Sequence, residues 1–187
     1  NIGMIDGSLH GVKGKTSWGT TINSSIHEYE ICYKCHSYSN MHKTNNIAQL
    51  FKPSNTSYHP VEQLSNNINA LKSLKPNLNS MTLITCSDCH GNDNKFGIKG
   101  PHGSNNKGIL KLNYENTEFT VKSTQLDNEL CFQCHKEKYI TESVGFRWHK
   151  LHIDSGYNCS ACHDSHGSKD YPTLLNFDKD YIRPLHN

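Results

Sequence analysis

Four cysteine pairs carry the clearest chemical signal in the 187-residue sequence. All eight cysteines occur as Cys-x-x-Cys, and a histidine directly follows each pair. With 13 histidines in the chain, four such coincidences have a chance probability of about 10⁻⁵. The motifs are Cys32, Cys35 and His36; Cys86, Cys89 and His90; Cys131, Cys134 and His135; and Cys159, Cys162 and His163.

The Cys-x-x-Cys-His spacing is typical of covalent haem attachment. Cysteines at positions i and i+3 lie on one face of a helical turn, so both can form thioethers with the two vinyl groups of a haem. A histidine at i+4 stays on that face and can ligate the iron as the proximal ligand. The sequence therefore predicts four covalently attached haem c groups, each held by a motif on a short helical turn.

Two other uses of cysteine pairs are alternatives. Two Cys-x-x-Cys pairs can form a tetrathiolate zinc site, although such a site has no use for a histidine after every pair. A disulfide scaffold suits an even number of cysteines in an exported chain. A bridge within one pair closes too short a loop to stabilise the fold much.

Composition predicts an unusual interior. Only 34% of the residues are hydrophobic, whereas globular chains usually have about 45–50%. Such a chain has difficulty burying enough surface to offset its ordering entropy, and four apolar macrocycles would supply the missing interior. We expect a mostly irregular or loop chain with short α-helices and few short strands, wrapped around a stack of four haems. Outside the motifs we expect an amphipathic helix over 60–74 and a hairpin within 109–121.

Charge and hydropathy exclude two classes of partner. The net charge of +2 is no electrostatic footprint for nucleic acid, which calls for a clustered basic face. No apolar run approaches the roughly 18 residues of a membrane helix, so no transmembrane segment is expected.

An internal repeat predicts how the chain is organised. The sequence around Cys32 resembles that around Cys131, and the sequence around Cys86 resembles that around Cys159. His-Gly-Ser follows the second motif of each pair, at 102–104 and 166–168. The predicted parts of one compact tetrahaem unit are an N-terminal arm (1–27), dihaem module 1 (28–104), a linker with a possible hairpin (105–125), dihaem module 2 (126–168) and a C-terminal tail (169–187).

Nine of the 13 histidines lie outside the motifs, and some of them should be distal iron ligands. The repeat favours His59, His102, His152 and His166, followed by His149 and His10. For His27, His42 and His186 a surface role is favoured. None of the three methionines occupies a repeated position. Histidine on both faces gives a low-spin, six-coordinate iron with no open position for a substrate.

These features predict a carrier of electrons rather than an enzyme. Four macrocycles in a chain of this length must have neighbouring edges close together, because the expected radius of gyration is about 16 Å. Saturated haems at such spacing form a path for electrons. Since thioether haem is assembled outside the cytoplasm, we expect an extracellular or cell-surface protein, with the periplasm as the alternative.

The paired motifs, with Gly-Pro-His-Gly-Ser at 100–104 and Cys-His-Asp-Ser-His-Gly-Ser at 162–168, resemble the doubled-CxxCH multihaem cytochromes. The two-module tetrahaem layout over the whole chain resembles the extracellular cytochrome nanowire proteins of the outer-membrane cytochrome E type. This resemblance implies a subunit that polymerises into a filament, in which one haem takes its distal histidine from the neighbouring subunit. His10 and His166 are the candidates for that shared ligand.

Two further functions are consistent with the same motifs. A monomeric soluble periplasmic shuttle with four haems needs no additional residues. A multihaem reductase for nitrite, hydroxylamine or a similar oxyanion needs an open iron position, often marked by a motif with another residue in place of histidine. The sequence contains no such variant motif.

Overall fold

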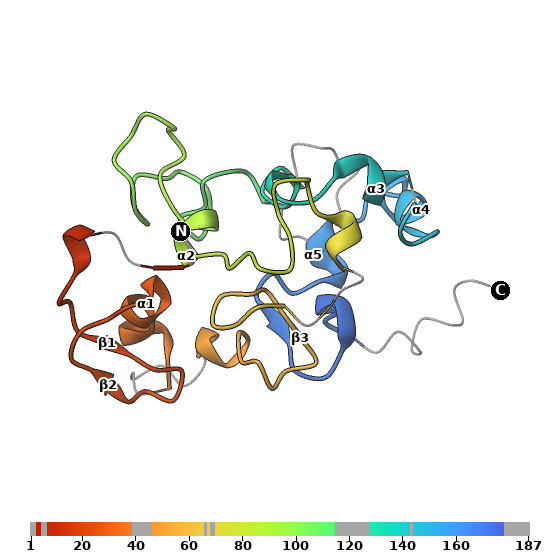
Figure 1. Ribbon diagram of the computed structural model, residues 1–187. Coiled ribbons are helices and arrows are strands. Elements are labelled where there is room, and N and C mark those ends of the chain that lie inside the picture. Colours follow the sequence, from red (N-terminus) through yellow and green to blue (C-terminus); the bar gives the residue numbers. More distant parts are fainter. Residues whose placement is uncertain are drawn as a thin grey trace. The chain divides into compact units, whose positions relative to one another are not determined.

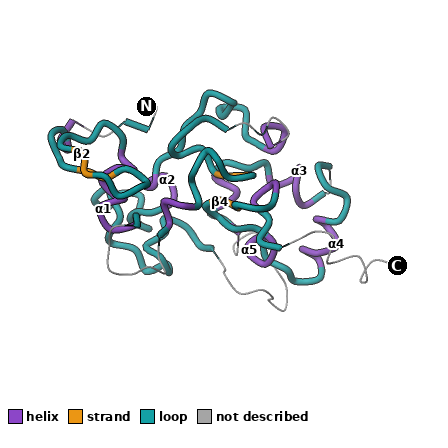
Figure 2. Tube along the Cα trace, turned by 90° about the horizontal axis from the view of Figure 1, so that it is seen from below, coloured by secondary structure: helices purple, strands orange, loops and turns teal. Residues whose placement is uncertain are grey.

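The structure is a computed structural model that describes residues 3–4, 7–38, 46–65, 67, 70–114, 128–142 and 144–177. His42 and His186 lie outside the described residues, as does much of the predicted linker and tail. Loops and turns make up most of the described chain (Figure 2), and its helices are short. The prediction of a mostly irregular chain with short helices and few strands is confirmed.

The regular elements occur as single turns and short helices (Figure 1). The α-helices are α1 (Glu28–His36), α2 (Cys86–Cys89), α3 (Glu137–Thr141), α4 (His149–Asp154) and α5 (Cys159–Cys162). The described 3-10 helices are η1 (Gly7–Leu9), η2 (Ile47–Gln49), η3 (Ala70–Ser73), η5 (Cys131–Gln133) and η6 (Pro172–Leu174). No described helix is long and apolar enough to cross a membrane.

Two small antiparallel sheets complete the described secondary structure. Strand β1 (Gly14–Lys15) pairs with β2 (Thr21–Ile22). Strand β3 (Ser57–Tyr58) pairs with β4 (Gly167–Ser168), with Ser57 opposite Ser168 and Tyr58 opposite Gly167. The second sheet joins segments that are far apart in sequence, so it fixes the chain just before His59 and just after His166.

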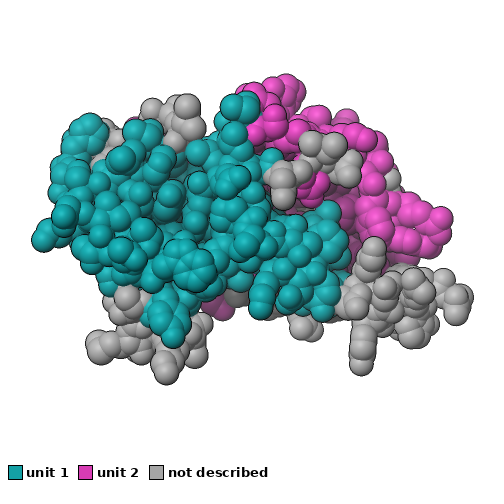
Figure 3. All heavy atoms as spheres, turned by 60° about the horizontal axis from the view of Figure 1, so that its bottom comes forward, with its two compact units in different colours: residues 1–65, 81–86, 165–187 teal, residues 66–80, 87–164 magenta. Residues whose placement is uncertain are grey.

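The chain divides into two compact units, which Figure 3 shows in different colours. Unit 1 contains Asn1–Ser65, Met81–Cys86 and Ser165–Asn187, and unit 2 contains Asn66–Ser80 and Ser87–Asp164. These units follow spatial compactness, whereas the predicted dihaem modules follow the sequence repeat, so the modules stay a prediction.

Unit 1 has a small apolar core. Tyr33, Ala48, Phe51 and Val61 are buried together. The phenol of Tyr33 is 1% exposed and donates a 2.7 Å hydrogen bond to Oε1 of Glu62. Tyr33 lies between the two cysteines of the first motif, so this core directly supports the helix that carries them.

Unit 2 is organised around two isolated antiparallel bridges. One joins His90 to Leu110 and the other joins Leu74 to His135. Backbone hydrogen bonds flank both: Lys111 donates to the carbonyl of Cys89 (2.9 Å) and Lys75 to that of Cys134 (2.8 Å). The second and third motifs are therefore held by main-chain pairing where each passes into its histidine.

The predicted helix over 60–74 is wrong for the described part of that range. Residues 60–63 form bends and 64–65 have no regular structure, and the only helix further along the described part of the range is the 3-10 helix η3. The segment is divided between the units at Ser65 and Asn66. Its apolar residues therefore serve two places, with Val61 in the unit 1 core and Leu74 in the bridge to His135. A single amphipathic helix cannot supply both.

The predicted hairpin within 109–121 lies largely outside the described residues. In its described part, 109–114, the chain forms the bridge through Leu110 but no strand.

Candidate haem-attachment sites

All four cysteine pairs lie on helical turns, as the spacing predicts. The first is within α1, the second and fourth form α2 and α5, and the third begins η5. In α1 the buried carboxylate of Glu30 accepts hydrogen bonds from the backbone N–H groups of Ile26 (2.7 Å) and His27 (3.0 Å). These bonds satisfy N–H groups at the start of the helix.

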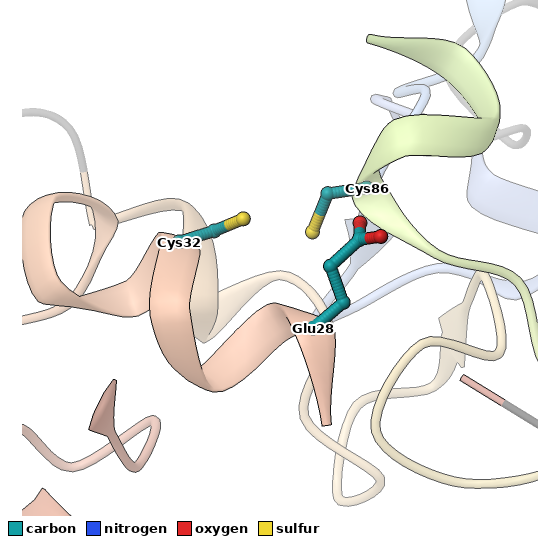
Figure 4. Close-up of side chains that lie close together, drawn as sticks. All are labelled: Glu28, Cys32 and Cys86. Carbon is teal, nitrogen blue, oxygen red and sulfur yellow. The ribbon is translucent and has the colours of Figure 1, made fainter. Parts of the chain in front are cut away.

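The first cysteines of motifs 1 and 2 lie beside each other in unit 1. Figure 4 shows the thiol of Cys32, from α1, and that of Cys86, from α2, pointing toward each other with Glu28 alongside. The two sulfurs and a carboxylate oxygen of Glu28 lie within 4.8 Å of one another. The hydrogen bond that the Cys86 thiol donates to Cys32, together with burial, raises the pKa of Cys86, so this thiol is protonated at neutral pH.

The first cysteines of motifs 3 and 4 repeat this arrangement in unit 2. The thiols of Cys131 and Cys159 are hydrogen-bonded to each other, and the hydrogen bond together with burial raises the pKa of Cys131. The buried side chain of Asn128 accepts a 3.1 Å hydrogen bond from the backbone N–H of Cys159, which fixes the start of α5.

Motif 2 also approaches motif 3. Burial raises the pKa of Cys89 to about 11, and the next causes include the neighbouring sulfurs of Cys134 and Cys131. Such an influence requires these groups to lie near one another. Because α2 carries Cys86 in unit 1 and Cys89 in unit 2, one helical turn contributes to both neighbour relations.

The arrangement differs from both alternative uses of cysteine. Within the described residues, the one group suited to a metal ion combines Glu28 with one cysteine from each of two motifs. A tetrathiolate zinc site needs both cysteines of each pair, and Cys35 is exposed. All eight cysteines are free of disulfides.

Two proximal-ligand candidates are oriented through Nδ1. In His90, the Nδ1–H donates to the carbonyl of Gly108 at 2.7 Å. In His135, Nδ1 lies 3.0 Å from the hydroxyl oxygen of Ser73. The carbonyl can only accept, so the bond to Gly108 fixes the tautomer of His90 and places its ligating lone pair on Nε2. The Ser73 hydroxyl can donate or accept, so its bond fixes the orientation of the His135 ring.

The other two motif histidines have different surroundings. His36 is exposed at the end of α1. The ring of His163 lies 6.3 Å, centroid to centroid, from that of His149. Burial, followed by the charges of His163 and His152, lowers the pKa of His149 to about 4, so His149 is neutral at pH 7.

Two distal-ligand candidates come together in unit 1. The backbone N–H of His59 donates to the carbonyl of His166 (3.0 Å), and its Nδ1–H donates to the carbonyl of Ser165 (2.6 Å). The ring of His166 packs edge-on against Phe51, with centroids 5.3 Å apart. Both rings are half-buried.

The remaining candidates are dispersed. His10 and His102 are exposed in loops. His152 lies within α4 and packs edge-on against Tyr157, with centroids 6.0 Å apart. The structure thus places His149 near a motif histidine and His59 near His166, and it leaves the predicted ligand set otherwise as a prediction.

One comparison with known proteins gives a match. The model of a family described as the doubled CXXCH motif matches residues 80–139 of the chain. This range includes motifs 2 and 3. The match indicates a multihaem c-type cytochrome. The chain has no significant match among curated proteins or solved structures.

The side chains of this chain fit covalently bound haem c, which CXXCH motifs imply. Paired thiols occupy helical turns, His90 and His135 have Nδ1 engaged, and Nδ1 of His149 is buried without a hydrogen-bond partner. A metal-ligating histidine commonly uses one nitrogen for the metal and the other for a hydrogen bond. The residues that would hold haem are therefore present with compatible chemistry.

Sequence reasoning missed the groups that orient these histidines. The partner of His90 is a backbone carbonyl, which any residue type provides. Ser73 lies far from His135 in sequence, and no pattern marks it. Glu28 stands at i−4 from Cys32, so helical periodicity could have placed its side chain beside that thiol.

Proposed function

We propose that this multihaem cytochrome carries four haem c groups and transfers electrons between them, as a carrier and not as a catalyst. The observation that carries the proposal is the placement of the attachment cysteines. Cys32 lies beside Cys86, Cys89 lies near Cys131 and Cys134, and Cys131 is hydrogen-bonded to Cys159. Each motif thus neighbours the next in sequence order.

Neighbouring thiols favour electron transfer because each thioether fixes an edge of its macrocycle at the sulfur. Two sulfurs in contact bring two such edges close to each other. Haem supplies reversible one-electron chemistry when bound. The chain contributes the cysteines that hold it and the histidines that ligate the iron. The packing of its apolar and polar side chains holds each motif beside the motif that follows it in the sequence.

Saturated ligation favours a carrier over a reductase. All four motifs supply a proximal histidine, and six further histidines are candidates for the distal position. An iron with histidine on both faces has no open position for an oxyanion. Carbon monoxide tests this point, because it binds a reduced iron with an open position. We expect the reduced native protein to bind almost none, and one equivalent per chain would favour the reductase.

We propose further that the protein is exported and forms the subunit of an extracellular filament. The haem count, chain length and module order support this part through the resemblance to cytochrome nanowire proteins. The histidines considered for an inter-subunit bond are His10 and His166. His10 is exposed, as such a ligand requires, whereas His166 packs within unit 1 against Phe51. His10 is therefore the better candidate for a ligand in trans.

Two measurements on the protein from its native host test the proposal. Intact mass should show four haem additions of about 0.6 kDa each, and fewer would contradict the four-haem count. Electron microscopy of the surface fraction should show regular filaments. Monodisperse single-chain particles with four haems would retain the electron-transfer function and identify a soluble periplasmic shuttle instead.

A further inference from the structure

His149 and His163 form the closest approach in unit 2 between a motif histidine and a histidine outside the motifs that the structure describes. Their ring centroids are 6.3 Å apart, and the ring planes are inclined by 51°. His163 belongs to the fourth motif, whereas His149 begins α4 and belongs to no motif. The distance lies near the long end of the range for direct aromatic contacts, and it also leaves room for one atom between the rings.

Metal–imidazole geometry accounts for this separation. A metal–nitrogen bond to histidine is about 2.0–2.1 Å. In a five-membered ring with bonds of about 1.35 Å, the centroid lies about 1.15 Å from each nitrogen. Two imidazoles on opposite sides of one metal therefore have centroids about 6.4 Å apart. The observed 6.3 Å agrees with that value.

The nitrogen chemistry of His149 supports the same role. Its Nδ1 is buried and makes no hydrogen bond. A buried polar atom without a partner is costly, and native proteins usually pair such atoms with a hydrogen-bonding group or a metal. An iron between the two rings would provide that partner.

Local structure holds the His149 ring toward the fourth motif. Phe146 packs edge-on against it, with centroids 5.1 Å apart, and the N–H of His149 donates to the carbonyl of Phe146 (3.1 Å). Gly156, with φ of +95°, follows α4 and reverses the chain. A left-handed glycine is the usual end of a helix, and here it returns the chain to α5 and His163.

His152 is the competing ligand on the same helix. Its ring packs against Tyr157, and the backbone N–H of Tyr157 donates to its carbonyl (3.0 Å). The approach of the His149 ring to His163 favours His149 at this iron, although the sequence repeat places His152 first.

We propose that His149 is the distal ligand of the iron whose proximal ligand is His163, on the haem held by Cys159 and Cys162. The inference rests on the proposed haem attachment at the fourth motif. It assigns His149 and His163 as the ligand pair of the haem at the fourth motif, so both ligands of that iron come from the same chain.

Single substitutions in the haem-loaded full chain test the assignment. In His149→Ala, intact mass should still show four haems, while electron paramagnetic resonance should show one ferric iron in four converted to high spin. The reduced variant should bind one equivalent of carbon monoxide. Lys150→Ala, at an exposed neighbour that forms an ion pair with Asp154, is the matched control and should keep every iron low-spin. His152→Ala tests the rival.

Rescue separates loss of a ligand from general damage. Imidazole added to His149→Ala should restore the low-spin signal, because it can occupy the position that the side chain left. If His149→Ala does not fold, His149→Met provides the second test. Methionine retains six-coordination and raises the reduction potential of one haem, so one of the four redox steps should move to a higher potential.

Three results overturn the assignment while leaving the proposed function intact. The first is that all four irons stay low-spin in His149→Ala, and the second is that His152→Ala gives the high-spin iron instead. The third is that the high-spin iron of His149→Ala persists when Cys159 and Cys162 are also replaced by serine, because that iron then belongs to another haem. A native chain whose mass shows no haem at the fourth motif contradicts the proposed function itself. The two failures are therefore distinguishable.

Discussion

The tripeptide His-Gly-Ser occurs twice after a haem motif, yet its two copies have different structures. At 166–168 it enters strand β4, where Gly167 and Ser168 are buried. At 102–104 it lies in a loop, where His102 and Gly103 are exposed. Identical residues thus form a sheet edge in unit 1 and a turn in unit 2.

The glycines show what each copy requires. A Cβ on Gly167 would collide with the carbonyl of Leu50, so this position needs a residue without a side chain. Gly103 instead has φ of +75°, which glycine adopts at little cost. The repeat therefore preserves the residue for two unrelated reasons, and it does not by itself establish that His102 and His166 have equivalent roles.

The largest expected effect is that of Gly167→Ala. The added Cβ forces β3 and β4 apart or displaces Leu50, so the free energy of unfolding should fall by about 3 kcal/mol. Gly103→Ala should cost about 1–2 kcal/mol through its left-handed backbone, and the side chain of Asn92, whose Nδ2 would lie 2.6 Å from the added Cβ, must also move aside. Denaturant unfolding of the haem-loaded variants measures both.

Gly7→Ala is the control for this pair, since a Cβ there meets nothing within 4 Å. Equal losses at Gly167 and Gly103 would contradict the structural difference between the two copies.

Ser57, opposite Ser168 in the sheet, should give the next largest effect. Its buried hydroxyl donates to the carbonyl of Tyr171 (2.7 Å) and accepts from the N–H of Leu174 (2.8 Å). Ser57→Ala leaves both groups without this partner and should lower the free energy of unfolding by about 2 kcal/mol. Exposed Ser54→Ala should change it little. A loss at Ser54 as large as at Ser57 would show that the sheet edge is not the cause.

Sequence patterns anticipated the local chemistry better than the long-range arrangement. The Cys-x-x-Cys spacing predicts a helical turn because two residues three apart share a face, and all four motifs have that turn. The helix over 60–74 failed because Val61 and Leu74 pack in different units, and periodicity cannot reveal how a chain is divided between cores.

The relations among motifs also needed the structure. Cys32 and Cys86 are far apart in sequence, and only tertiary packing brings their sulfurs together. The repeat placed His152 ahead of His149. Both residues lie between the paired motifs, and the sequence does not show which of the two rings lies near His163. The carbonyl of Gly108, which orients His90, carries no sequence signal at all.

The half-buried carboxyl of Glu62 in unit 1 should make stability fall as pH rises. Burial raises the pKa of Glu62 above its ordinary value of 4.5, although Tyr33 and Lys52 oppose the shift. The folded chain therefore binds more protons than the unfolded chain between the two pKa values. Stability is lost from about pH 4.5 up through the folded pKa. Glu62→Gln should remove this slope while retaining an acceptor for Tyr33.

Denaturant unfolding at a series of pH values, as the difference between native and Glu62→Gln, isolates this contribution from the titration of other groups. Exposed Glu142→Gln is the control. An unchanged slope in Glu62→Gln would show that its carboxyl has no raised pKa in the fold.

The loop around the His-Gly-Ser copy at 102–104 should show the opposite dependence of stability on pH, and this effect should be the smallest. Asp93 accepts hydrogen bonds from the backbone N–H (2.8 Å) and side-chain amide (3.0 Å) of Asn105, and the backbone bond is the largest cause that lowers its pKa from 3.8. A lowered folded pKa stabilises the loop above the unfolded value, and this stability is lost as pH falls through the folded pKa. Asp93→Asn should therefore weaken the hydrogen-exchange protection of Asn105 at neutral pH, and the difference from the native chain should vanish on acidification below 3.8. Exposed Asp170→Asn should leave that protection unchanged. If the difference in the protection of Asn105 instead grew on acidification, the pKa of Asp93 would be raised rather than lowered. The contrast with Glu62 would then disappear.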